Sequence, residues 1–215
     1  MTKKVFARPA RLPLIGGLVW VFPALAQAPV PPPPPNPPMC ATPEQAAPVT
    51  AFYEKTPAVL PLLATRTLKM PEALIASALK PNQALGALGK SFTTLWDSAR
   101  TWGDVVFFAS KEGNQFEVNG LLPEGVQSTS SNYFNLGPQK AGITGHLRAD
   151  RIVSIYAISL QEGKTHLRGL VFYDGKGDSQ FAVFLPGEGA PVPKETEAAF
   201  DKTWSLIASM PRVCK

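Results

Sequence analysis

The sequence predicts an α+β fold: N-terminal helices packed on a large antiparallel β-sheet, with a C-terminal helix. Three observations predict this class. Residues 42–88 and 91–102 show helical hydrophobic periodicity, and residues 105–185 then form apolar stretches separated by glycine-containing turns. A helical stripe returns at 195–210. Short turns join antiparallel neighbours, so we expect one domain, residues 42–215, built on an antiparallel sheet.

The stretch from Thr42 to Leu88 is interpreted as helical. Thr42-Pro43-Glu44 precedes one helix, and Met70-Pro71-Glu72 opens a clearer one, where proline suits the first turn because its missing N–H has no helical partner there. A further helix is expected from Ser91 to Trp102. Its apolar face consists of Phe92, Leu95, Trp96 and Ala99, which are expected in the core.

Strands follow from residue 105 onward. The apolar stretch 105–109 and the alternating stretch 115–118 flank a hairpin turn at 111–114. A polar loop at 127–132 leads into Tyr133-Phe134-Asn135-Leu136. Three more strands are predicted at 151–159, 165–173 and 179–185, joined by turns at 161–164 and 174–178.

The N-terminus has the pattern of a leader. Four basic residues, Lys3, Lys4, Arg8 and Arg11, precede a short apolar run that ends at Ala26-Gln27-Ala28, which predicts a signal peptide over 1–28 and a periplasmic protein without stable membrane insertion after cleavage. Residues 29–41 form a proline-rich linker. Removing the four basic residues from 21 leaves 17 against 16 acidic ones, which argues against a nucleic-acid partner.

The two cysteines lie at opposite ends of the predicted domain. Cys40 and Cys214 are expected to form one disulfide that joins the termini. A redox pair or a metal site would need a CxxC-like spacing, which is absent.

Enzyme motifs are scarce. The sequence contains no P-loop, GxGxxG, GxSxG or HExxH motif. A Ser/His/Asp hydrolase set has candidate residues in His146 and several serines, but no local signature supports it. We therefore expect a binding protein rather than an enzyme.

The stretch Gly145 to Arg151 carries a set of side chains suited to binding. His146 offers a neutral imidazole to a metal, and Tyr133 offers a phenolate of the kind that ligates haem iron. The guanidinium groups of Arg148, Arg151 and Arg168 match the geometry of carboxylates such as haem propionates. The structural alternative is a charged turn in which Asp150 pairs with its neighbours and Tyr133 lies at the edge of the core.

Several motifs in order resemble the ChuX/HutX family of haem-utilisation carrier proteins, from about Thr50 to about Ser209. They are Trp102-Gly103, Phe116-Glu117-Val118, residues 120–125, Tyr133-Phe134-Asn135-Leu136, residues 145–151 and Gln180-Phe181. The resemblance implies an α+β fold, often dimeric, and non-covalent binding of haem b. It also implies iron ligation by His146 and involvement of Tyr133 in haem binding.

Three features differ from the family. Residues 181–188 depart from the late-strand motif of the family and lose its basic and acidic groups. Some members carry a second haem-linked histidine where this chain has Phe108-Ala109-Ser110, which leaves the second axial position to Tyr133, water or a partner protein. Members are also cytosolic, whereas the leader predicts export. The resulting hypothesis is a periplasmic haem carrier or store, with a haem donor or acceptor protein as partner. The alternatives are a haem-modifying or haem-degrading enzyme, a binding module for another flat or acidic ligand, and a purely structural module.

Overall fold

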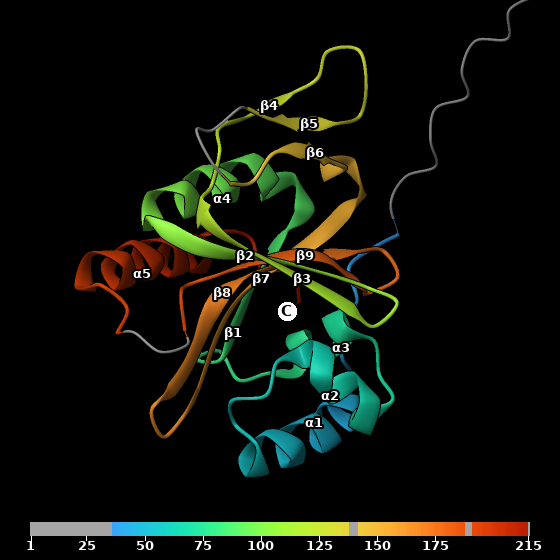
Figure 1. The fold of residues 1–215 in the computed structure, drawn as a ribbon. Helices are drawn as coiled ribbons and strands as arrows, with labels where there is room; N and C mark the ends of the chain where they lie inside the picture. Colours follow the sequence, from blue (N-terminus) through green and yellow to red (C-terminus); the bar gives the residue numbers. More distant parts are fainter. Residues whose placement is uncertain (1–35, 138–141, 188–190, 215) are drawn as a thin grey trace, which may run out of the picture. The chain divides into compact units, whose positions relative to one another are not determined.

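Six antiparallel strands form the central sheet of the molecule (Figure 1). The structure, a computed structural model, describes residues 36–137, 142–187 and 191–214. The strand order is β1-β7-β8-β9-β2-β3. Their bounds are β1 Ala84–Leu88, β7 Ile152–Glu162, β8 Thr165–Asp174, β9 Ser179–Phe184, β2 Asp104–Lys111 and β3 Asn114–Leu121. The predicted α+β fold with a large antiparallel sheet is confirmed, and the predicted meander corresponds to β7, β8 and β9.

Helices cover both faces of this sheet (Figure 1). Their bounds are α1 Pro43–Lys55, α2 Pro61–Leu68, α3 Glu72–Ala78, α4 Phe92–Ala99 and α5 Lys194–Ser209. Alternate residues of a strand point to opposite faces. Ile155 and Ala157 of β7 accordingly join the core beneath α4 and α5, whereas Tyr156 and Ile158 join a second core beneath α1–α3.

The N-terminal half departs from the sequence prediction at one element. Residues 84–88, interpreted as part of a helical region, form β1, the edge strand that pairs with β7. Gly86 lies directly opposite Tyr156, and a Cβ at Gly86 would lie 2.7 Å from the Tyr156 ring. Helical periodicity could not reveal β1, because its register depends on a partner strand seventy residues further along the chain.

A small second sheet lies over the α4 side of the molecule (Figure 1). It comprises β4 Gly125–Gln127, β5 Phe134–Leu136 and β6 Gly145–Leu147, all antiparallel. Phe134 is 1% exposed and packs edge-on against Phe92 and Trp96. The small sheet is thereby attached to the core through its inner face.

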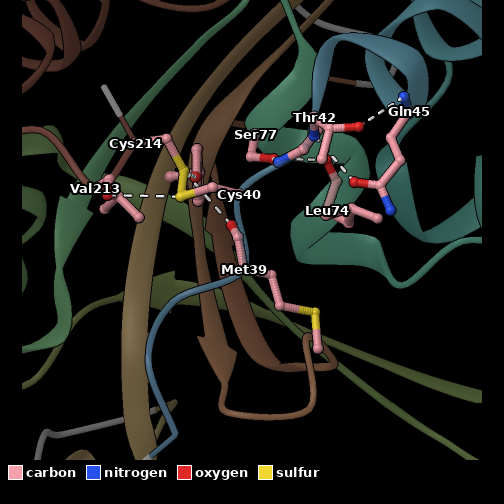
Figure 2. The surroundings of a disulfide bond; sticks show 10 residues. Met39, Cys40, Thr42, Gln45, Leu74, Ser77, Val213 and Cys214 are labelled. Atoms are coloured by element: carbon pink, nitrogen blue, oxygen red, sulfur yellow. Dashed lines mark hydrogen bonds between the residues drawn. A yellow bond between two sulfur atoms is a disulfide. The ribbon is translucent and has the colours of Figure 1, made fainter.

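The two ends of the domain are joined by the disulfide between Cys40 and Cys214 (Figure 2). Their Cα atoms lie 5.6 Å apart, across a sequence separation of 174 residues. The N–H of Ala41 donates to Ser77 Oγ at 2.9 Å, which ties the N-terminal segment to α3. Arg212 forms an antiparallel bridge with Ala87, so the C-terminal segment lies along the outer edge of β1.

A carboxylate lies buried in the second core. Glu72 Oε1 accepts a hydrogen bond from Tyr173 Oη at 3.2 Å, and Glu72 Oε2 accepts one from the Ser179 N–H at 3.4 Å. Burial nevertheless dominates and raises the pKa of Glu72 to about 7. Glu72 therefore titrates in the neutral range.

The predicted signal peptide, residues 1–28, and the linker up to residue 35 lie outside the described residues. Within the described ranges, no helix has both the length and the apolar character needed to cross a membrane.

Candidate functional site

The predicted site residues His146 and Tyr133 lie together on the outer face of the small sheet. Asn135 and His146 are direct partners in the β5–β6 register, and Val126 lies opposite Asn135 on the other side. Directly opposed residues of antiparallel strands share a face. Because Phe134 and Leu136 point into the core, the row Val126-Asn135-His146 points outward.

Tyr133 lies two residues before Asn135, just ahead of β5, and therefore on the same outer face. Tyr133 is 42% exposed, and the centroid of its ring lies 5.9 Å from that of the His146 ring in an edge-to-face arrangement. The Tyr133 carbonyl accepts hydrogen bonds from the Ser128 N–H at 2.8 Å and from Gln127 Nε2 at 3.2 Å. These bonds close the polar loop between β4 and β5 and hold Tyr133 beside the histidine.

The His146 ring is held from the side by Asn135. Nδ1 of His146 and Oδ1 of Asn135 are 2.8 Å apart, a normal hydrogen-bond distance. The imidazole is exposed at the surface. This contact was not foreseen from the sequence, although Asn135 belongs to the Tyr133–Leu136 motif and lies two residues from Tyr133.

Arg148 adds a positive charge next to the two rings. Its guanidinium carbon lies 5.6 Å from the centroid of the Tyr133 ring, within cation–π range. Nε and one Nη of Arg148 each donate to the Asp150 carboxylate at 2.7 Å. These hydrogen bonds lower the pKa of Asp150, and the nearby charge of Arg151 lowers it further. The charged turn expected as the structural alternative therefore exists, and it lies beside the candidate ligands.

Arg168 does not belong to this group. Its side chain, in β8, is 8% exposed, donates to Glu197 of α5 and lies with its guanidinium carbon 5.9 Å from the Phe200 ring centroid. The sequence grouped Arg168 with Arg148 and Arg151 by residue type. The structure instead uses it to bridge the sheet and α5.

The second histidine has a different setting. His166 Nε2 lies 3.0 Å from Ser159 Oγ on the neighbouring strand, and the ring is half-buried. Burial, followed by the charge of Arg168, lowers the pKa of His166. Across the part of the chain that the structure describes, no three His, Cys, Asp or Glu side chains gather as a set for a metal ion.

A cavity of about 520 Å³ lies elsewhere in the molecule, lined by residues of α2, α3 and the β2–β3 and β8–β9 turns. Its lining includes Glu72, Lys111 and Lys176, and none of the predicted haem-binding residues. Among the described residues, the candidate site lies on the outer face of the small sheet, away from this cavity.

Comparison with known proteins places the chain in a family. Residues 87–203, more than half of the chain, match the model of the family described as haem utilisation ChuX/HutX. The chain belongs to the ChuX/HutX family. The matched range contains β1 in part, all three strands of the small sheet, and most of α5.

A curated relative is similar to this chain in sequence, and two solved structures are similar to it in fold. The intracellular heme transport protein HutX of Vibrio cholerae serotype O1 is 26% identical over 139 residues, covering 64% of this chain and 70% of the relative. The structure of the heme-binding protein ChuX matches at a TM-score of 0.66 and 21% identity, over 75% of this chain and 99% of that one. ChuS, an E. coli heme oxygenase, matches at a TM-score of 0.60 and 12% identity, over 72% of this chain and 48% of that one.

The predicted periplasmic location is wrong. It rested on the charge and hydropathy pattern of residues 1–28, and such a pattern does not report cleavage or export by itself. The Vibrio cholerae relative in the same family is an intracellular heme transport protein. The assignment to the periplasm is therefore withdrawn.

Proposed function

We propose that residues 42–215 bind haem b non-covalently at the outer face of the small sheet and act as a haem carrier or store. The observation that carries the proposal is the pairing of an exposed imidazole with a phenol ring 5.9 Å away, in a chain of the haem-utilisation family. His146 supplies the iron ligand, because neutral imidazole is a common protein ligand of haem iron.

Neighbouring side chains suit the rest of the haem. Arg148 and Arg151 lie at the same end of β6 and match the geometry of propionate carboxylates. Arg148 would then exchange its bonds to Asp150 for bonds to a propionate, so the loss of the Asp150 pair offsets part of the gain from the propionate contact. Val126, 64% exposed and in the same row as His146, offers an apolar surface to the porphyrin.

The open setting favours a second protein surface over the other face of the haem. The second axial position belongs to Tyr133, water or a residue of that partner. A second copy of this chain, or a haem donor or acceptor protein, would fill this role. Such an arrangement suits hand-over, because a ligand held on an exposed face is released without opening the core.

Haemin titration followed by Soret absorbance tests this function. We expect a saturable shift at one haem per chain, and no saturable shift would contradict the proposal. Reductant is then added to the haem-loaded protein with and without oxygen. A stable ferrous spectrum fits a carrier, whereas bands of an opened tetrapyrrole that appear only with oxygen would show a haem-degrading enzyme instead.

A further inference from the structure

Asn135 is the side chain that contacts the imidazole of His146 most closely through a polar atom. The two residues are register partners on β5 and β6, and Oδ1 lies 2.8 Å from Nδ1. The neighbours of Asn135 in β5, Phe134 and Leu136, are both buried in the core. The backbone that carries Asn135 is therefore fixed from below, and the amide reaches the imidazole from a rigid position.

The chemistry of the two groups decides where the imidazole proton is. An amide oxygen accepts hydrogen bonds and cannot donate. With Asn135 Oδ1 as its partner, Nδ1 of neutral His146 must carry the hydrogen, which leaves the lone pair on Nε2. Free histidine prefers the opposite tautomer, with the hydrogen on Nε2. The contact with Asn135 thus selects the form that presents Nε2 as a ligand.

We propose that Asn135 is a positioning residue that holds His146 in the Nδ1–H tautomer and fixes its ring for iron ligation through Nε2. The tautomer follows from the Asn135 contact alone, whereas its consequence for affinity rests on the proposed haem binding at His146. Metal-ligating histidines usually donate their other ring N–H to a fixed acceptor, and loss of such a partner costs about 10- to 100-fold in affinity.

The tautomer is measured in the ligand-free protein with ¹⁵N-labelled histidine at pH 8, where an ordinary imidazole is neutral. The chain has 2 histidines, so the spectrum contains two imidazole systems, and His146→Ala assigns them. We expect His146 as Nδ1–H in the wild type and a shift towards Nε2–H in Asn135→Ala. Asn135→Asp keeps Nδ1–H, because a carboxylate also only accepts. Ser159→Ala is the matched control and changes the spectrum of His166 alone.

Haemin affinity is then measured for the same variants, with far-UV circular dichroism as a check of folding. Asn135→Ala is expected to weaken binding about 10- to 100-fold, and Asn135→Asp to restore most of it. A wild-type His146 in the Nε2–H form, or a tautomer unchanged in Asn135→Ala, would overturn the inference whatever the haem result. A third outcome is that the tautomers are as expected but His146→Ala binds haemin as well as the wild type does. That result would support the role of Asn135 in setting the tautomer and would contradict the proposed function.

Discussion

The two sheets of this protein differ in how much of each is buried. In the central sheet, most residues of β7, β8 and β9 are buried, because helices cover both faces. The small sheet has strands of three residues, and only its inner face, with Phe134 and Leu136, joins the core. Its outer row of Val126, Asn135 and His146 is left to solvent or ligand.

This difference separates stability from binding. Side chains of the central sheet contribute to the free energy of folding through buried area, and most changes there cost stability. The outer row of the small sheet contributes little to the core and is available for a ligand, while its inner face keeps it in place. Substitutions in the central sheet should therefore change mainly the free energy of unfolding, and substitutions in the outer row should change mainly the haemin affinity.

The largest expected effect on stability comes from the disulfide. Replacing Cys40 and Cys214 by serine removes a constraint on a segment of 174 residues, which in the chain-entropy model costs about 5 kcal/mol of unfolding free energy. Urea unfolding of the oxidised protein and the double variant measures the difference. Haemin affinity should stay unchanged wherever the variant is folded. An equal urea midpoint for both proteins would show that the disulfide does not stabilise the fold.

Phe134→Ala should change both stability and haemin binding, unlike substitutions in the central sheet or in the outer row. Phe134 is the buried attachment of the small sheet to Phe92 and Trp96, so its loss should cost about 3–5 kcal/mol and also loosen the site. Urea unfolding and haemin titration are both expected to change. Val126→Ala on the outer face is the matched control, with a stability change of about 0.5 kcal/mol or less. Unaltered haemin binding in Phe134→Ala would show that the inner face does not hold the site.

Glu72 makes the stability of the central sheet depend on pH. Its pKa is about 7 in the folded protein against an ordinary glutamate value of 4.5, so between these values the folded state binds more protons than the unfolded one. Stability is therefore expected to fall as pH rises from 4.5 to 7, by up to about 3 kcal/mol. Tyr173 and Tyr53, which face Glu72, stay neutral over this range, because burial raises the pKa of both phenols further above their usual values.

Glu72→Gln removes the titrating proton and keeps an acceptor for Tyr173. The variant should show a flatter profile of unfolding free energy against pH and should be more stable than the wild type at pH 8. A variant whose profile has the same slope as that of the wild type would assign the pH dependence to other groups.

The sequence revealed the central sheet better than the small one. Alternation in β8 and glycine at positive φ in its turns, Gly163 and Gly177, are local signals, so the hairpins were predicted. Strands of three residues, such as β5 and β6, are too short to show alternation of apolar and polar residues. Their pairing, and hence the contact between Asn135 and His146, depends on a register set across the loop between them.

The candidate site was predicted in part for the same reason. His146, Tyr133 and Arg148 lie close together in the structure, as their motifs suggested. Arg168 does not, because its residue type was visible in the sequence but its partner Glu197, 29 residues away on α5, was not. Proximity in space was predicted correctly only for residues of two motifs that follow each other closely along the chain.

The two histidines provide the most direct test of the central claim, that the outer face of the small sheet binds haem through His146. His146→Ala and His166→Ala are compared with the wild type by haemin titration and by urea unfolding. We predict that His146→Ala loses most of the haemin affinity with a stability change of about 0.5 kcal/mol or less, because its side chain is exposed. His166→Ala should keep wild-type affinity. Equal haemin affinity for His146→Ala and the wild type, or loss of binding in His166→Ala alone, would contradict the claim.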